Sequence, residues 1–109
     1  MCLILVAWRC HAAFPLVVAA NRDESLTRPS APPAEVEPGV IAGRDLESGG
    51  TWLGVNKHGL FVAVTNRKMP ARTPDSLSRG LLALETLRCR KLPCVEGIVE
   101  RRVRDHAIA

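Results

Sequence analysis

The order of the patterned segments constrains this chain more than any other feature. Short apolar runs with strand character lie at residues 2–9, 16–20, 51–55 and 60–65, and two amphipathic segments with helical spacing follow Pro74. Strands followed by helices predict an α+β fold in which helices cover one face of an antiparallel sheet. At 109 residues, the chain has room for one domain with a modest core and not for two.

The first two runs predict a hairpin. The first run, Cys2–Arg9, is apolar on both faces, so we expect it to be covered on both sides. If the turn is centred near residue 12, residues i and j pair where i + j is roughly 23–26. Cys2 then lies opposite Asn21-Arg22-Asp23-Glu24, which brings the first cysteine beside the first dense polar cluster of the chain.

The middle of the chain is rich in proline and glycine. Four prolines in Thr27–Gly39 exclude a regular helix and predict a loop. Gly49 and Gly50 permit close backbone approach or a turn with positive φ. The runs at 51–55 and 60–65 predict a second hairpin whose turn begins at an asparagine and ends at a glycine.

Two helices are expected in the last third of the chain. Four leucines between residues 77 and 87 have helical spacing, with Asp75 or Ser76 as the N-cap. The pattern resumes at Val95, and Leu92-Pro93 is expected to separate the two helices. The second pattern runs to the end of the chain without a capping signal. We therefore expect a single domain over residues 1–109 that is truncated at its C-terminus.

Charge and hydropathy narrow the possible partners. The net charge is +4, and seven of the fifteen Lys and Arg residues lie in the last 31 residues, a region without Phe, Trp or Tyr. Nucleic-acid binding usually adds aromatic stacking platforms, so a solvated helix surface explains these charges better. The apolar runs are shorter than the ~18 residues that a membrane span needs. We expect a soluble, cytoplasmic chain with no membrane span and no nucleic-acid partner.

The four cysteines show no CxxC spacing. This favours reduced thiols in a cytoplasmic protein, with Cys89 and Cys94 as free thiols that flank helices. Cys10-His11 lacks the second pair of ligands that a zinc site needs. We expect neither a metal nor a cofactor.

Cys2 is the strongest candidate for reactivity because it follows the initiator methionine. If Met1 is removed, one residue carries both a thiol and a free α-amine. Such groups ordinarily titrate within about one pH unit of each other, so the amine can take the thiol's proton. The alternative is that Cys2 is a small apolar residue at the start of a strand.

Three further residues could support such a nucleophile. Arg22 could bind an anionic substrate group or hold the thiolate, and Asp23 could orient the α-ammonium of Cys2. Asn66 closes the second hairpin, and its amide could donate to the oxyanion of a tetrahedral intermediate, a contact whose loss costs about 3 kcal/mol. The alternative is that both segments are turns, in which the Asn and Asp side chains satisfy local backbone groups.

Several motifs together resemble the NRDE superfamily, also called the transport and Golgi organisation protein 2 family. They occur in order over residues 1 to 80. The motifs are Met1-Cys2, Asn21-Arg22-Asp23-Glu24, Arg28-Pro29, Ala31-Pro32-Pro33, Gly43-Arg44-Asp45, Gly49-Gly50-Thr51-Trp52-Leu53-Gly54, Thr65-Asn66 and Ser78-Arg79-Gly80.

The family is similar to the N-terminal-nucleophile hydrolases of the penicillin V acylase and bile-salt hydrolase type. The resemblance implies the N-terminal half of an αββα sandwich, with Cys2 as nucleophile and base. It implies Arg22 and Asp23 as supports and Asn66 as oxyanion donor. Two residues within the motifs, Arg44 and Trp52, are candidates for substrate binding. Members are about twice this length, so the other half of the sandwich is expected to be missing.

Three functions remain open at this point. The first is an amidohydrolase or acyltransferase that acts on a small amide or acyl substrate through a Cys2 acyl-enzyme. The second is a trafficking or carrier protein for haem or a lipid-derived ligand, in which Arg22 and Arg44 would hold carboxylates or propionates. The third is an inactive fragment.

Overall fold

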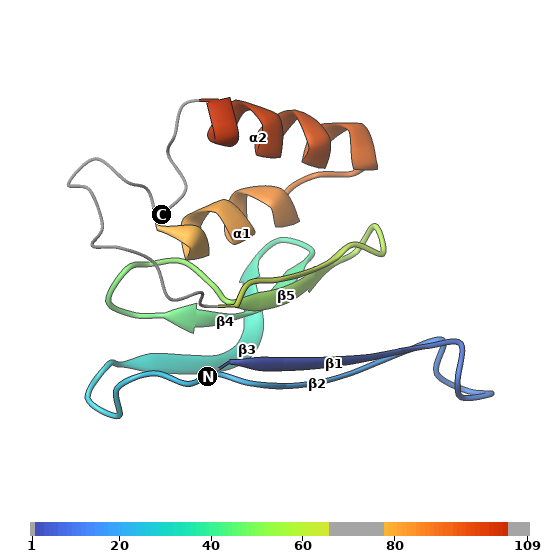
Figure 1. The fold of residues 1–109 in the computed structure, drawn as a ribbon, viewed down its shortest axis with the longest axis horizontal. Coiled ribbons are helices and arrows are strands. Elements are labelled where there is room, and N and C mark those ends of the chain that lie inside the picture. The colour runs from blue at the N-terminus through green and yellow to red at the C-terminus, as the bar shows by residue number, and fades with distance from the viewer. Residues whose placement is uncertain (1, 66–77, 105–109) are drawn as a thin grey trace.

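The computed structural model describes residues 2–65 and 78–104 and confirms the α+β class (Figure 1). These residues form two antiparallel sheets, one with strand order β1-β2 and one with strand order β3-β4-β5-β6. In Figure 1, α1 lies between α2 and the four-stranded sheet, and the β1–β2 hairpin lies on the opposite side of that sheet. The elements are β1 (Leu3–Trp8), β2 (Leu16–Asn21), β3 (Ser30–Glu37), β4 (Val40–Asp45), β5 (Leu53–Asn56), β6 (Phe61–Ala63), α1 (Arg79–Leu87) and α2 (Leu92–Arg104).

The first hairpin forms in the expected register. Leu3 pairs with Asn21 and Trp8 pairs with Leu16, so the numbers of paired residues add up to 24. The expectation that β1 is covered on both sides is wrong for the described part of the chain. Leu5 and Val6 point to opposite faces, yet they are 59% and 57% exposed. The reason is that, within the described residues, β1 pairs only with β2, outside the four-stranded sheet that the helices cover.

The proline-rich segment is a strand rather than the expected loop. Among the described strands, β3 pairs only with β4 and forms an edge of its sheet. An edge strand tolerates proline because its outward side needs no N–H donors. The pairing register also shifts between Ala31 and Ala34, where Pro32 and Pro33 interrupt the ladder. The prolines therefore exclude a helix, as expected, and still permit an edge strand.

The second hairpin is confirmed and borders the core, which lies between β4 and α1. β5 and β6 pair with Val55 opposite Phe61, and Gly59 in the turn has a φ of 85°. Helix α1 packs on this hairpin. Leu87 is fully buried against Val40 and Ala42 of β4.

Both helices start at positions other than those expected. Ser78, not Asp75 or Ser76, caps α1, and its side-chain oxygen accepts a hydrogen bond from the Gly80 N–H. Leu92-Pro93 begins α2 instead of separating the helices. Proline fits the first turn of a helix because an N–H at that position has no partner within the helix.

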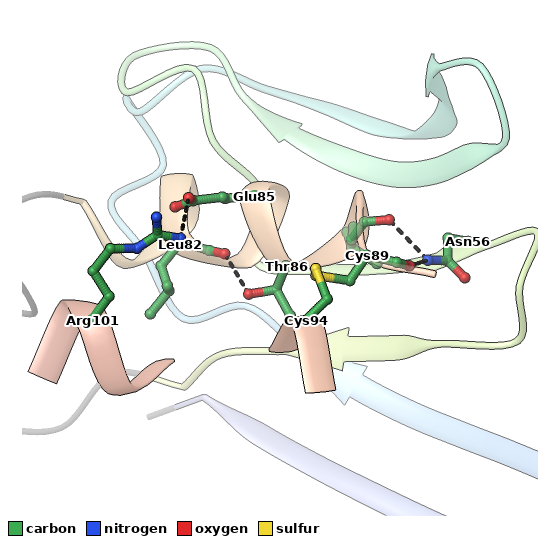
Figure 2. The surroundings of a disulfide bond; sticks show 8 residues. Asn56, Leu82, Glu85, Thr86, Cys89, Cys94 and Arg101 are labelled. Atoms are coloured by element: carbon green, nitrogen blue, oxygen red, sulfur yellow. Dashed lines mark hydrogen bonds and ion pairs between the residues drawn. A yellow bond between two sulfur atoms is a disulfide. The ribbon is translucent and has the colours of Figure 1, made fainter. Parts of the chain in front are cut away.

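The expectation of free thiols at Cys89 and Cys94 is wrong, because the two form a disulfide (Figure 2). Cys89 follows the C-cap of α1 and is buried, while Cys94 lies in the first turn of α2. The short connection between the helices brings the Cα atoms of the two cysteines to 5.7 Å from each other, within the range that a disulfide spans. Asn56 also stabilises the C-terminal end of α1, because its Nδ2 donates to the carbonyls of Leu87 and Cys89 at 2.9 and 2.7 Å.

Most basic residues of the helical region are exposed on the surface, as the charge pattern predicts. Arg88 pairs with Glu37 of β3, with Nε 2.9 Å from Oε2, and Arg102 pairs with Glu85 of α1 at 2.7 Å. No described helix is both long enough and apolar enough to cross a bilayer.

Candidate functional site

The hairpin register places Cys2 beside the polar end of β2. Leu3 pairs with Asn21, so Cys2 lies opposite Arg22. The backbone N–H of Asp23 donates to the Cys2 Sγ over 3.4 Å. The Asn21 Oδ1 accepts from the N–H of Leu3 at 3.0 Å, which fixes the start of β1. The thiol is therefore held at a defined point by the adjacent strand end.

Cys2 lines a cavity of about 130 Å³ that several distant segments build together. The end of β2, the loop that follows it, the end of β4 and the start of α1 all contribute. Most of the lining side chains are charged or carry a hydroxyl group. The lining residues are Cys2, Arg22, Glu24, Arg28, Asp45, Ser48, Thr51, Trp52, Val64, Ser78, Arg79 and Gly80.

Asp45, at the end of β4, organises one wall of this cavity. Its Oδ2 accepts hydrogen bonds from Arg22 Nη2 and from Arg28 Nε, both at 2.9 Å. Its Oδ1 accepts from the backbone N–H groups of Glu47 and Ser48 at 3.0 and 3.1 Å. The carboxylate is thus saturated with donors and joins the loop after β2 to the four-stranded sheet.

These contacts shift the pKa values of the groups involved. Burial alone raises the pKa of Asp45, but the Arg28 hydrogen bond and the N–H donors of Ser48 and Glu47 outweigh it and lower the pKa from 3.8 to about 2. The same hydrogen bond to Asp45 raises the pKa of Arg28 above its ordinary value. The wall is therefore charged and paired throughout the neutral range.

Arg22 is held from two directions. Its guanidinium carbon lies 4.7 Å from the centre of the Trp52 ring, within cation–π range. Trp52 in turn lies against Gly43, where a Cβ would come within 2.6 Å of the ring. Gly43 thus provides the space for Trp52, and Trp52 and Asp45 together fix the Arg22 head group.

The N-terminus of α1 forms another part of the cavity wall. The Thr51 N–H donates to the Gly80 carbonyl at 3.1 Å. A Cβ on Gly50 would lie 2.3 Å from the Gly80 carbonyl carbon. Gly49 has a φ of 77°. The glycine pair therefore supplies both features expected of it, a turn with positive φ and a close backbone approach.

The structure brings together some of the expected site residues and not others. Cys2, Arg22 and Trp52 line the cavity, and Asp23 reaches the thiol through its backbone N–H. Arg44 is not among the lining residues, and Asn66 lies outside the described residues.

Arg44 lies elsewhere, near the edge strand. The pKa of Glu37 is lowered first by its hydrogen bond to Arg88 and to a smaller extent by the charge of Arg44. The Arg44 Nε is buried and has no hydrogen-bond partner among the described residues. Arg44 therefore belongs to the surroundings of Glu37 rather than to the cavity.

Sequence reasoning missed Asp45, Arg28 and Arg79 as residues of the cavity. All three occur in motifs that carry the family resemblance, which was the available signal. Asp45 is 23 residues from Arg22 and 17 residues from Arg28 in the sequence. Spacing along the chain therefore did not reveal these two pairs. Within residues 2–65 and 78–104, no three His, Cys, Asp or Glu side chains cluster to hold a metal ion.

Comparisons with known proteins place these motifs in one family. The family model described as Transport and Golgi organisation 2 matches residues 1–101. A Transport and Golgi organization 2 homolog of Mus musculus is 41% identical over 64% of this chain and 27% of its own length. The homologs of Bos taurus and Homo sapiens are each 38% identical over 69% of this chain and 29% of their own length.

The chain thus spans less than a third of the length of these curated relatives. No solved structure shows significant similarity to it.

Proposed function

The chain belongs to the Transport and Golgi organisation 2 family, and we propose that it carries the nucleophile of an N-terminal cysteine hydrolase or acyltransferase for small amide or acyl substrates. The observation that carries this proposal is the position of Cys2. Its sulfur accepts from the Asp23 N–H and lines a polar cavity at the start of β1. A cysteine that served only to fill a core would instead have apolar neighbours.

The reaction follows from a thiol and an amine on one residue. After Met1 is removed, the α-amine of Cys2 takes the Sγ proton, and the thiolate attacks the substrate carbonyl carbon. The tetrahedral intermediate collapses as the resulting α-ammonium protonates the leaving amine, which departs and leaves a thioester on Cys2. Water, or an acceptor amine or alcohol, then attacks the thioester and regenerates the thiol. Asn66 stays the predicted oxyanion donor.

The cavity favours a small reacting group. Its volume of about 130 Å³ is below the roughly 300–1,000 Å³ of pockets that enclose drug-sized ligands. An amide or a short acyl group fits such a space, whereas haem or a lipid-derived ligand would need a larger one. The names of the relatives refer to transport and Golgi organization, and no described feature of the cavity favours the carrier alternative over catalysis.

A cytoplasmic location is part of the same proposal. The Cys89–Cys94 bond would then exchange with cellular thiols, because the cytosol keeps most protein cysteines reduced.

Mass spectrometry tests the proposal in two steps. The intact mass of the purified chain shows whether Met1 is absent, as the mechanism requires. The protein is then incubated with a small activated acyl ester, and peptide mapping locates the acyl group. We expect one acyl group per chain, on Cys2, at neutral pH.

The variant C2A is expected to abolish this acylation, and C10S is expected to leave it unchanged because Cys10 is an exposed free thiol outside the cavity. Retained Met1, or equal acylation of Cys2 and Cys10, would contradict the proposed function.

A further inference from the structure

Arg79 is a charged residue of the cavity that the proposed mechanism does not use. It is half-buried at the first position of α1 and lines the same cavity as Cys2. Its side chain forms no ion pair or hydrogen bond with the residues at 2–65 and 78–104. A cationic group that lines a cavity and has no counter-ion in the described part of the chain calls for an explanation.

The other charges around the cavity satisfy one another. Arg22 and Arg28 both pair with Asp45, at 2.9 and 2.8 Å. Glu24 lies 3.9 Å from Arg28. Glu47, just outside the lining, lies 3.5 Å from Arg28 as well. Of the three arginines that line the cavity, Arg79 is therefore the one without an ion pair to any described residue.

We infer that Arg79 determines specificity by binding a carboxylate group of the acyl substrate beside the Cys2 thiol. A guanidinium presents paired N–H donors that match the two oxygens of a carboxylate. A single unpaired guanidinium balances the single charge of a carboxylate, whereas a phosphate monoester carries about −1.5 to −2 at neutral pH. The claim that the bound carboxylate belongs to an acyl substrate rests on the proposed function. The anion site itself rests only on the residues that line the cavity.

The start of α1 holds Arg79 in place. The Gly80 carbonyl accepts from the Thr51 N–H at 3.1 Å, and the Ser78 side chain accepts from the Gly80 N–H at 3.2 Å. The close contact between Gly50 and Gly80 ties this helix end to the sheet. The position of Arg79 relative to the cavity is therefore set by the backbone on both sides of it.

Two alkylating reagents that differ in charge test the inference. With iodoacetate and with iodoacetamide, a thiolate attacks the CH₂ carbon, an S–C bond forms and iodide leaves. The ratio of the two rate constants at one cysteine cancels the fraction of thiolate, so it reports the local preference for a carboxylate. We expect this ratio at Cys2 to exceed the ratio at Cys10 by about three- to tenfold, the effect of one nearby charge at intermediate dielectric.

Three variants complete the experiment. R79Q is expected to bring the ratio at Cys2 down to that at Cys10, and R79K is expected to retain part of the preference. R90Q is the matched control, because Arg90 is exposed and does not line the cavity, and it should leave the ratio unchanged. Equal ratios at Cys2 and Cys10 in the unsubstituted chain, or a ratio that R79Q leaves unchanged, would overturn the inference.

The alkylation experiment is independent of turnover. If the anion preference depends on Arg79 but Cys2 is not acylated, the anion site is supported and the proposed reaction is contradicted. If Cys2 is acylated but shows no anion preference, the proposed reaction is supported and the anion site is contradicted.

Discussion

The Arg22 Nη2 lies 2.9 Å from the Asp45 Oδ2, and this pair connects the polar end of the β1–β2 hairpin to the end of β4 in the other sheet. The two side chains are 17% and 11% exposed. An exposed ion pair contributes little to the stability of a fold. Removing one partner of a pair this well buried is costly, because the other partner is left as an uncompensated buried charge. Asp45 therefore both organises the cavity and joins the two sheets.

Acid is expected to weaken the fold through Asp45. Because the pKa of Asp45 is lowered from 3.8 to about 2 in the folded chain, its stabilisation is complete above about pH 4 and is lost as the pH falls to about 2. The shift corresponds to about 2 kcal/mol of unfolding free energy. Urea unfolding at pH 4 and pH 2 measures the loss, and D45N should show a loss smaller by that amount. An equal loss in both proteins would contradict the assignment.

Gly50 is expected to tolerate no side chain. G50A places a Cβ 2.3 Å from the Gly80 carbonyl carbon, so the start of α1 must move away from the sheet, at a cost of roughly 1–3 kcal/mol. G97A is the control, because a Cβ there meets no atom within 4 Å, and alanine inside a helix stabilises by roughly 0.5–1 kcal/mol. Urea unfolding of both variants is the measurement, and changes of the same sign would contradict this account.

Asn56 is expected to be the most sensitive polar residue of the second hairpin. Its Nδ2 donates to the Leu87 and Cys89 carbonyls, and its Oδ1 accepts from the N–H groups of His58 and Leu60, both at 3.0 Å. N56A leaves these groups without partners, which we expect to cost about 2–4 kcal/mol, since each orphaned buried group costs about 1–3 kcal/mol.

The control for this prediction is H58A. The His58 side chain is exposed and its backbone N–H is retained, so we expect a change within about 0.5 kcal/mol in urea unfolding. Similar losses in N56A and H58A would mean that the turn, and not the amide, carries the stability.

The disulfide is expected to stabilise the helix pair. The Cys89–Cys94 bond closes a short loop, with a sequence separation of 5, so the entropic model predicts a contribution of roughly 2 kcal/mol. Unfolding with and without a thiol reductant should differ by this amount. C94S should be insensitive to the reductant, while C10S should respond like the unsubstituted chain.

Local patterns predicted much of the scaffold. The numbers of paired residues in the first hairpin add up to 24 because a short turn sets the register of its strands. The second hairpin and the two helices follow from apolar spacing in the same way. The proline-rich edge strand was missed because proline signals the absence of a helix more clearly than it signals the edge of a sheet.

The contacts of the candidate site likewise fall into local ones that the sequence predicts and distant ones that depend on the fold. The sequence by itself determined that Cys2 would lie beside Arg22 and Asp23, because hairpin pairing is a local property. Only the tertiary structure decided that Asp45 neutralises Arg22 and Arg28, that Arg79 lines the same cavity without a partner among the described residues, and that Cys89 and Cys94 are bonded. Those contacts depend on how the two sheets and the helices pack, and no spacing along the chain specifies that packing.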